Sequence, residues 1–278
     1  MKLYSWDECD NCNHLFGEYD NELALFVQPL LAVGNFPAKK GVPKLRGTGT
    51  TLERRKNNDG RTTLVMMSEC QDFSEAMAIN PFTRTMDMQL PIANQRFRPM
   101  FAYKALSKIG FGLLPRSEMD NFTLLRKWLL DKDDIEGFNA LEVEFRHGII
   151  PHPFPTLYCS LNRRASDCDA IPYMHLVLAV GALMFHIDLM PDTKDDHLPP
   201  LPFGATQIGW KSTLSGPEGE DGFEQQYLNP MFFNWASPER ENHPFTGFHI
   251  RVGISDQTIS ISPIPRDRIN VSGHGAKH

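Results

Sequence analysis

The sequence predicts an α+β protein, and two observations indicate this fold class. Apolar residues recur at helical spacing in the first part of the 278-residue chain, up to about residue 130. From residue 141 onward they alternate with polar residues, as at Leu141, Val143 and Phe145, which is typical of half-buried strands. The charged residues at 131–136 lie between these two patterns and mark a natural boundary.

The first part is expected to contain three helices. Asp20 is placed to cap the first one, over residues 20–31, and Pro29 limits how far that helix runs regularly. Pro99 suits the first turn of the second helix, which runs to residue 114. Ser117 is placed as the N-cap of the third helix, which runs toward residue 130.

Strands are expected in both parts of the chain. Asn58-Asp59-Gly60 is a strong turn signal and predicts a hairpin that leads into a strand over residues 61–68. Met86, Met88 and Leu90 alternate with polar neighbours and predict a strand over residues 84–90. Further candidate strands cover residues 141–145, 154–161, 174–189, 248–254 and 258–262, with a tight turn at residues 256–257.

Composition restricts the class of protein. A hydrophobic fraction of 41% and a charged fraction of 22% are ordinary for a folded globular chain. The net charge of −6 argues against a uniformly basic surface of the kind that binds nucleic acid nonspecifically. The sequence has neither a long uncharged apolar run nor a secretory leader, so we expect no membrane partner. Five cysteines, an odd number without a leader, favour reduced thiols and a cytoplasmic location.

Cys9 and Cys12 form a CxxC pair, which is half of a typical tetrahedral zinc site. The other cysteines do not form a second pair, so two zinc ligands are missing from any obvious place. A CxxC pair is also a redox motif, usually at the start of a helix in a thioredoxin-like unit. The residues that follow, Asn13 and Phe16-Gly17, favour the zinc interpretation.

The segment Glu8-Cys9-Asp10-Asn11-Cys12-Asn13, followed by Phe16-Gly17, Asp20 and Leu23, resembles the HNH endonucleases. The resemblance is to bacterial and phage members in which a CxxC…CxxC zinc site brackets a catalytic ββα element, and it covers residues 5–46. It implies a partial HNH-like zinc-knuckle module at 1–46. Together with the patterns above, this divides the rest of the chain into a mixed α/β region at 47–136 and a β-rich C-terminal domain of unknown role at 137–278.

The resemblance also implies roles for individual residues. Cys9 and Cys12 would hold a structural Zn²⁺, Asn13 would organise the active-site loop, and Asp20 or Asn21 would stand near a catalytic Mg²⁺ or other divalent cation. In the intact family an upstream histidine activates water for phosphodiester hydrolysis. Because the chain begins at Met1, we expect this histidine and the first CxxC to be absent. A truncated protein with weak or no cleavage activity is therefore expected.

Residues 39–61 form a basic segment with a local charge of +6, from eight basic and two acidic residues. Glycine and asparagine are interleaved with the basic residues, which predicts flexible loops or a hairpin able to follow a phosphate backbone. A solvated charged loop explains the composition equally well. The candidate nucleic-acid-binding residues are Lys39, Lys40, Lys44, Arg46, Arg54, Arg55 and Lys56.

Two function classes therefore remain open. The first is an HNH-endonuclease-like protein, and the alternative is a non-catalytic module, derived from a nuclease, that binds nucleic acid or a protein. Lys104 and Lys108 could face phosphate, although helix surfaces carry such lysines routinely. His175 and His186 could contribute to a metal site, but without a metal-binding spacing they are more simply hydrogen-bonded core residues.

Overall fold

The computed structural model describes residues 9–33, 44–46, 50–56, 62–68, 77–91, 95–131, 141–147, 154–166, 171–181, 183–198, 205–213, 225–253 and 259–265. Within these ranges both helices and strands are present, so the α+β class is confirmed. The helices are α1 (Asp10–Val33), α2 (Pro99–Gly112), the 3₁₀ helix η1 (Arg116–Phe122) and α3 (Thr123–Leu130). The predicted turn at 256–257 lies outside the described residues.

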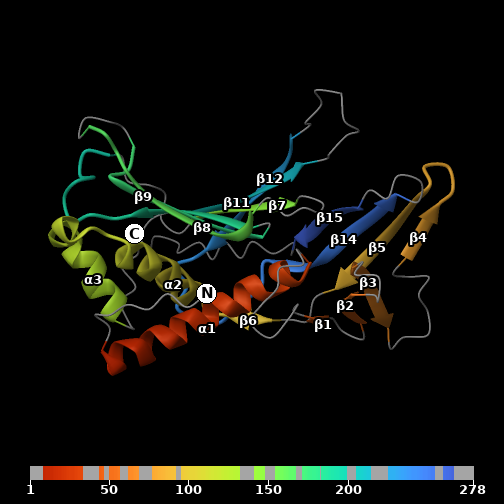
Figure 1. Cartoon of the computed structure of the whole chain (residues 1–278), viewed down its shortest axis with the longest axis horizontal. Helices are drawn as coiled ribbons and strands as arrows, with labels where there is room; N and C mark the ends of the chain where they lie inside the picture. The colour runs from red at the N-terminus through yellow and green to blue at the C-terminus, as the bar shows by residue number, and fades with distance from the viewer. Residues whose placement is uncertain are drawn as a thin grey trace, which may run out of the picture.

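The largest sheet has six strands in the order β12-β11-β7-β10-β9-β8. Each of the six strands pairs antiparallel with a neighbour, and β11 also pairs parallel with β7. Figure 1 shows α1 and α2 side by side on one side of this sheet. The strands are β7 (Leu141–His147), β8 (Phe154–Arg163), β9 (Met174–Gly181), β10 (Leu183–Leu189), β11 (Ala205–Thr213) and β12 (Gln225–Asn234).

A second sheet has the order β15-β14-β5-β4 and takes strands from both sides of the boundary at residues 131–136. In its centre β5 pairs antiparallel with β14, with Met88 opposite Ile250. The short strands β6 and β13 pair across the same boundary. The first and second parts of the chain therefore share sheets. The strands are β4 (Met77–Asn80), β5 (Thr85–Pro91), β6 (Arg96–Phe97), β13 (Glu241–Asn242), β14 (Phe245–Gly253) and β15 (Ile259–Pro265).

A three-stranded sheet, β1-β2-β3, contains most of the described basic segment. Its strands are β1 (Leu45–Arg46), β2 (Thr50–Lys56) and β3 (Thr62–Ser68). β2 pairs antiparallel with β3, as expected for the two strands of the predicted hairpin, and the predicted turn Asn58-Asp59-Gly60 lies outside the described residues. The predicted strand at 174–189 proves to be two strands, β9 and β10, which pair antiparallel with each other.

The main core lies where α1, α2 and the six-stranded sheet meet. Phe26 of α1 is fully buried and packs edge-on against Trp235, with 4.9 Å between the ring centroids. Tyr19, also on α1, donates its hydroxyl to the carbonyl oxygen of Leu129 at 3.1 Å. Burial raises the pKa of Tyr19 to about 12, so this hydroxyl remains a donor at neutral pH.

Helix α1 continues through Pro29, which has no N–H to donate to the carbonyl of Leu25. Close to this point His243 reaches α1 from the connection between β13 and β14. Its Nδ1 accepts from the Phe245 N–H at 3.2 Å, so its Nε2–H donates to the Phe26 carbonyl at 3.0 Å. The second half of α1 is thereby tied to the C-terminal part of the chain.

Two predicted helix caps are wrong. Asp20 does not begin the first helix, because α1 starts at Asp10 and Asp20 lies in its middle. Ser117 does not begin a long third helix, because residues 116–122 form η1 and α3 starts only at Thr123. The start of α3 is capped instead by Asp192, which lies far along the chain. Its carboxylate accepts hydrogen bonds from the backbone N–H groups of Thr123 and Leu124.

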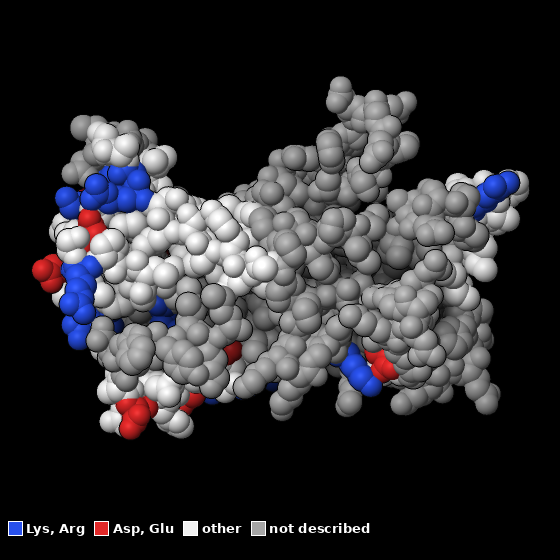
Figure 2. Space-filling view, viewed as in Figure 1, with Lys and Arg blue, Asp and Glu red and all other residues white. Residues whose placement is uncertain are grey.

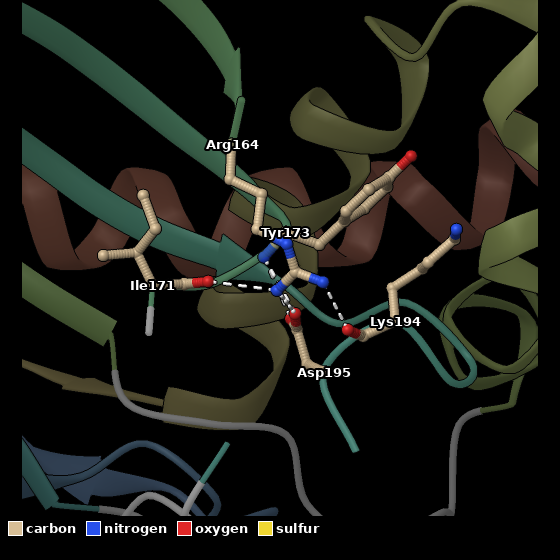
Figure 3. A network of polar contacts seen from close by, with 5 residues as sticks. All are labelled: Arg164, Ile171, Tyr173, Lys194 and Asp195. Atoms are coloured by element: carbon tan, nitrogen blue, oxygen red, sulfur yellow. Dashed lines mark hydrogen bonds and ion pairs between the residues drawn. The ribbon is translucent and has the colours of Figure 1, made fainter. Parts of the chain in front are cut away.

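A buried polar network fixes the loop that follows β10 (Figure 3). The Arg164 guanidinium, with 1% of its side chain exposed, donates to the Asp195 carboxylate at 2.7 Å. It also donates to the carbonyl oxygens of Ile171 at 3.1 Å and Lys194 at 2.5 Å. The Asp195 carboxylate in turn accepts from the Tyr173 N–H at 2.9 Å. The network therefore joins the ends of β8 and β9 to this loop.

Candidate functional site

Cys9 and Cys12 lie at the start of α1, and their Sγ atoms are 3.0 Å apart. The Cys9 carbonyl accepts the first backbone hydrogen bond of the helix, from Asn13 at 2.9 Å. The Cys9 Sγ accepts from the Cys12 N–H at 3.3 Å, so Cys9 takes the place that serine or aspartate usually occupies as an N-cap. This local geometry holds the two sulfur atoms together on the surface.

The thiol of Cys9 is exposed, and its pKa is lowered from the ordinary value. The main cause is the hydrogen bond with the Cys12 side chain, and the second is the hydrogen bond from the Cys12 backbone N–H. Both bonds stabilise the thiolate, which is the form that binds metal and attacks disulfides. The pair is therefore chemically competent as two zinc ligands or as a redox dithiol.

The other residues predicted for a catalytic centre, Asn13, Asp20 and Asn21, all lie on α1 and are exposed. Asn13 and Asp20 are seven residues apart, which is about 10 Å along a helix axis. One cation cannot bind both side chains across this distance, because metal–oxygen bonds are about 2.0–2.6 Å long. The Asp20 carboxylate also forms an ion pair with Lys108 on α2, at 2.9 Å.

The two lysines considered as phosphate contacts have different environments. Lys104 is fully buried, and its ammonium group donates to the Trp128 carbonyl oxygen at 2.7 Å. It cannot face phosphate, so this interpretation is wrong for Lys104. Lys108 is partly exposed but is paired with Asp20.

The candidate nucleic-acid-binding residues are divided between strands and undescribed positions. Arg46 lies on β1, and Arg54, Arg55 and Lys56 lie at the end of β2, opposite residues 62–64 of β3. Lys44 forms an ion pair of 2.5 Å with the buried Glu53, which offsets part of its charge. Lys39 and Lys40 lie outside the described residues. Among the described residues in Figure 2, Lys and Arg gather mainly at the end of the molecule that carries α3.

The cysteine pair and the basic strands lie at opposite ends of α1. Figure 1 shows the start of α1 near α3, while β1, β2 and β3 lie near the other end of the helix. A helix of 24 residues is about 36 Å long. The structure therefore does not bring these two groups of candidate residues into one site.

The β9–β10 hairpin brings together three residues that the sequence analysis did not connect. The Nδ1 atom of His175 lies 2.7 Å from Asp188 Oδ1, and its Nε2 atom lies 3.3 Å from His186 Nδ1. The sequence would have indicated this arrangement only if residues 174–189 had been divided into two paired strands. The antiparallel register of β9 and β10 pairs His175 with Asp188, and His186 lies two residues from Asp188 on the same face of β10. Because 174–189 was predicted as one strand, this pairing was missed.

Within the described part of the chain, no group of three or more histidine, cysteine, aspartate and glutamate side chains is arranged to hold a metal ion. The described helices also include none that is long and apolar enough to cross a membrane. Comparisons with protein-family models, curated proteins and solved structures found no match.

Proposed function

We propose that this chain is an HNH-endonuclease-like protein that binds zinc through Cys9 and Cys12 and contacts nucleic acid. The observation that carries the proposal is the cysteine pair at the start of a helix, the exposed thiol of Cys9 and the half-buried thiol of Cys12, with their Sγ atoms 3.0 Å apart. Two thiolates bound to one tetrahedral zinc ion at about 2.3 Å each lie about 3.8 Å apart, so the two side chains would separate by about 0.8 Å when they bind the ion. The pair would supply two of the four ligands of a structural zinc site.

The chain alone is proposed to have weak or no nuclease activity. Asn13 and Asp20 are too far apart along α1 to share a divalent cation, and Asp20 is paired with Lys108. We therefore derive no hydrolytic step through Mg²⁺ or another catalytic cation. Robust Mg²⁺-dependent nicking of DNA by the pure protein, abolished by Asn13→Ala, would overturn this part of the proposal.

Zinc binding is tested with Co²⁺ as a spectroscopic probe. The protein should bind Co²⁺ with a sulfur-to-cobalt charge-transfer band, and Zn²⁺ should displace it. Cys9→Ser and Cys12→Ser should each remove the band. Cys159→Ser is the matched control, because Cys159 lies on β8 and should not affect the band. No charge-transfer band, or a band that survives in the Cys9→Ser/Cys12→Ser double variant, would contradict the proposal.

Nucleic-acid binding is tested by the salt dependence of affinity for duplex DNA. Neutralising Arg54, Arg55 and Lys56 together should weaken binding and make the slope of log K against log salt shallower by about 2–3, because each lost phosphate contact removes about 0.9. Arg126→Gln with Lys127→Gln, on exposed positions of α3, is the control. If neutralising Arg54, Arg55 and Lys56 left the salt dependence of DNA affinity unchanged, these residues would not contact phosphate.

A second candidate function is thiol–disulfide exchange, which is favoured by the helix-start position of the pair and the lowered pKa of Cys9. The Cys9 thiolate would attack a disulfide RSSR and release RS⁻, and Cys12 would then attack Cys9 and release a second RSH. The products are a Cys9–Cys12 disulfide and two thiols. With glutathione disulfide, Cys12→Ser should accumulate a glutathione adduct at Cys9, whereas the unsubstituted protein should lose two hydrogens. If neither product forms, this candidate fails.

A further inference from the structure

The outer face of the β9–β10 hairpin carries a cluster of three polar side chains, which we call the His175 cluster: His175, His186 and Asp188. In the β9–β10 ladder His175 lies opposite Asp188, and His186 lies opposite Val177. Their neighbours Leu176, Phe185 and Ile187 are buried in the main core. Because side chains alternate along a strand, the cluster occupies the opposite face. The side chains of His175 and Asp188 are 35% and 22% exposed, so a small ligand can reach them.

Asp188 determines which nitrogen of His175 is available. Its Oδ1 atom lies 2.7 Å from His175 Nδ1, so a neutral His175 donates its proton from Nδ1 to the carboxylate. The lone pair of His175 then belongs to Nε2, which faces His186. A carboxylate that accepts from the far nitrogen of a histidine is the usual outer partner of a metal-binding imidazole, because it fixes the tautomer and increases the basicity of the ring.

The distance between the two facing nitrogens equals the distance expected when two imidazoles bind one metal ion. His175 Nε2 and His186 Nδ1 are 3.3 Å apart. Two imidazole nitrogens, each about 2.0–2.1 Å from a tetrahedral zinc ion, are separated by about 3.3 Å. The same distance also accommodates a weak hydrogen bond between the rings. An ion and a shared proton are thus the two occupants that the experiment must distinguish.

We propose that the His175 cluster binds one divalent transition-metal ion, with Zn²⁺, Co²⁺ and Ni²⁺ as the fitting class. His175 Nε2 and His186 Nδ1 are the ligands, and Asp188 is a positioning residue that does not touch the metal. Two protein ligands leave the remaining positions to water, so the site is open.

The test uses the full chain with Cys9→Ser and Cys12→Ser, so that the proposed zinc knuckle cannot contribute. Co²⁺ titration should give one bound ion without a sulfur-to-cobalt band. His175→Gln and His186→Gln should each weaken binding at least tenfold. Asp188→Asn should weaken it about 10–100-fold, as outer partners of metal-bound histidines do. His14→Gln, an exposed histidine on α1, is the matched control and should leave affinity unchanged.

A second measurement needs no substitution in the cluster. In NMR spectra of the Cys9→Ser/Cys12→Ser protein, Co²⁺ should broaden resonances of residues 174–178 and 185–189 before others. Absence of binding, or binding that persists in the His175→Gln/His186→Gln double variant, would overturn the proposal and leave a hydrogen bond between the two rings. Failure here does not affect the cysteine site, whose readout is the sulfur-to-cobalt band of the unsubstituted protein.

Discussion

The Nζ atom of Lys104, on α2, donates a hydrogen bond of 2.7 Å to the carbonyl oxygen of Trp128, near the end of α3. It also donates to the carbonyl oxygen of Asp131. The same ammonium group lies 4.7 Å from the centroid of the Trp128 ring. The Lys104 side chain is fully buried, so its charge is balanced by the carbonyl oxygens at the negative end of the α3 dipole and by the aromatic face.

Lys104→Met should lower the free energy of unfolding by about 2–3 kcal/mol, because the carbonyl oxygens of Trp128 and Asp131 lose their charged donor. Met has nearly the same length as Lys, so the loss comes from the hydrogen bonds rather than from a cavity. Lys108→Met, one turn later on α2, is the control. It removes the Lys108–Asp20 ion pair and the contact of the Lys108 ammonium with the Phe16 ring, 5.3 Å from the ring centroid, and should cost less than about 1 kcal/mol. Urea unfolding measures both changes. If the two variants lost the same free energy of unfolding, the hydrogen bonds of Lys104 to the end of α3 would not be the stabilising contact.

These two lysines show where prediction from the sequence reached its limit. The helix over residues 99–114 could be predicted, because its apolar spacing and Pro99 are local signals, and the structure has α2 at Pro99–Gly112. The burial of Lys104 could not, because it depends on α3, which begins nineteen residues later in the chain. The start of α1 was missed for a similar reason. Its first turns are stabilised by Phe16 and Tyr19, which are buried against partners distant in the sequence.

The candidate site was predictable only in part. The CxxC pair is a local pattern, and its geometry follows from the helix that begins directly after Cys9. The catalytic residues Asn13, Asp20 and Asn21 were predicted from the resemblance to a ββα element, whereas here all three lie on one continuous helix that spaces them along its axis. The His175 cluster depends on the register between two strands, and no spacing within one strand could have revealed it.

Gly110→Ala should destabilise the protein by about 1–2 kcal/mol, because a Cβ at this position would lie 2.8 Å from a Cδ atom of Leu189. Leu189 is buried and has little freedom to move. Gly17→Ala, in the middle of α1, is the matched substitution with the opposite sign. A Cβ at Gly17 has no neighbour within 4 Å, so the gain in helix propensity should stabilise the protein by about 0.5–1 kcal/mol. Thermal unfolding of both variants checks the difference in sign.

The Glu118 carboxylate should make the fold sensitive to acid. Its pKa is lowered from 4.5, first by the hydroxyl of Tyr173 at 2.7 Å and also by Asn121 and Arg163, both at 2.9 Å. A group with a lower pKa in the folded state stabilises the fold above its unfolded pKa. That contribution disappears as pH falls through the folded pKa.

Glu118→Gln should therefore reduce the loss of stability below about pH 5. Urea unfolding at several acidic pH values measures this loss as a change in slope. Asp120→Asn, on the exposed side of η1, should change the slope less. If the two variants had the same acid profile, the hydrogen bonds to Glu118 would not explain the lowered pKa.

The Arg164–Asp195 pair should show strong coupling in a double-mutant cycle. Arg164→Met removes three hydrogen bonds and leaves the Asp195 carboxylate with only the Tyr173 N–H as a described donor, so a loss of about 3–5 kcal/mol is expected. Asp195→Asn keeps the shape of the side chain but removes its charge, and should cost less. Asp196→Asn, the exposed neighbour, is the control and should have little effect.

In the Arg164→Met/Asp195→Asn double variant the uncompensated charge is gone, so its cost should be smaller than the sum of the two single costs by about 1–3 kcal/mol. Strict additivity would mean that the two side chains stabilise the loop independently. The network would then be held by the backbone carbonyl oxygens of Ile171 and Lys194 rather than by the ion pair. The expected coupling instead identifies the ion pair as the contact that joins the loop after β10 to the ends of β8 and β9.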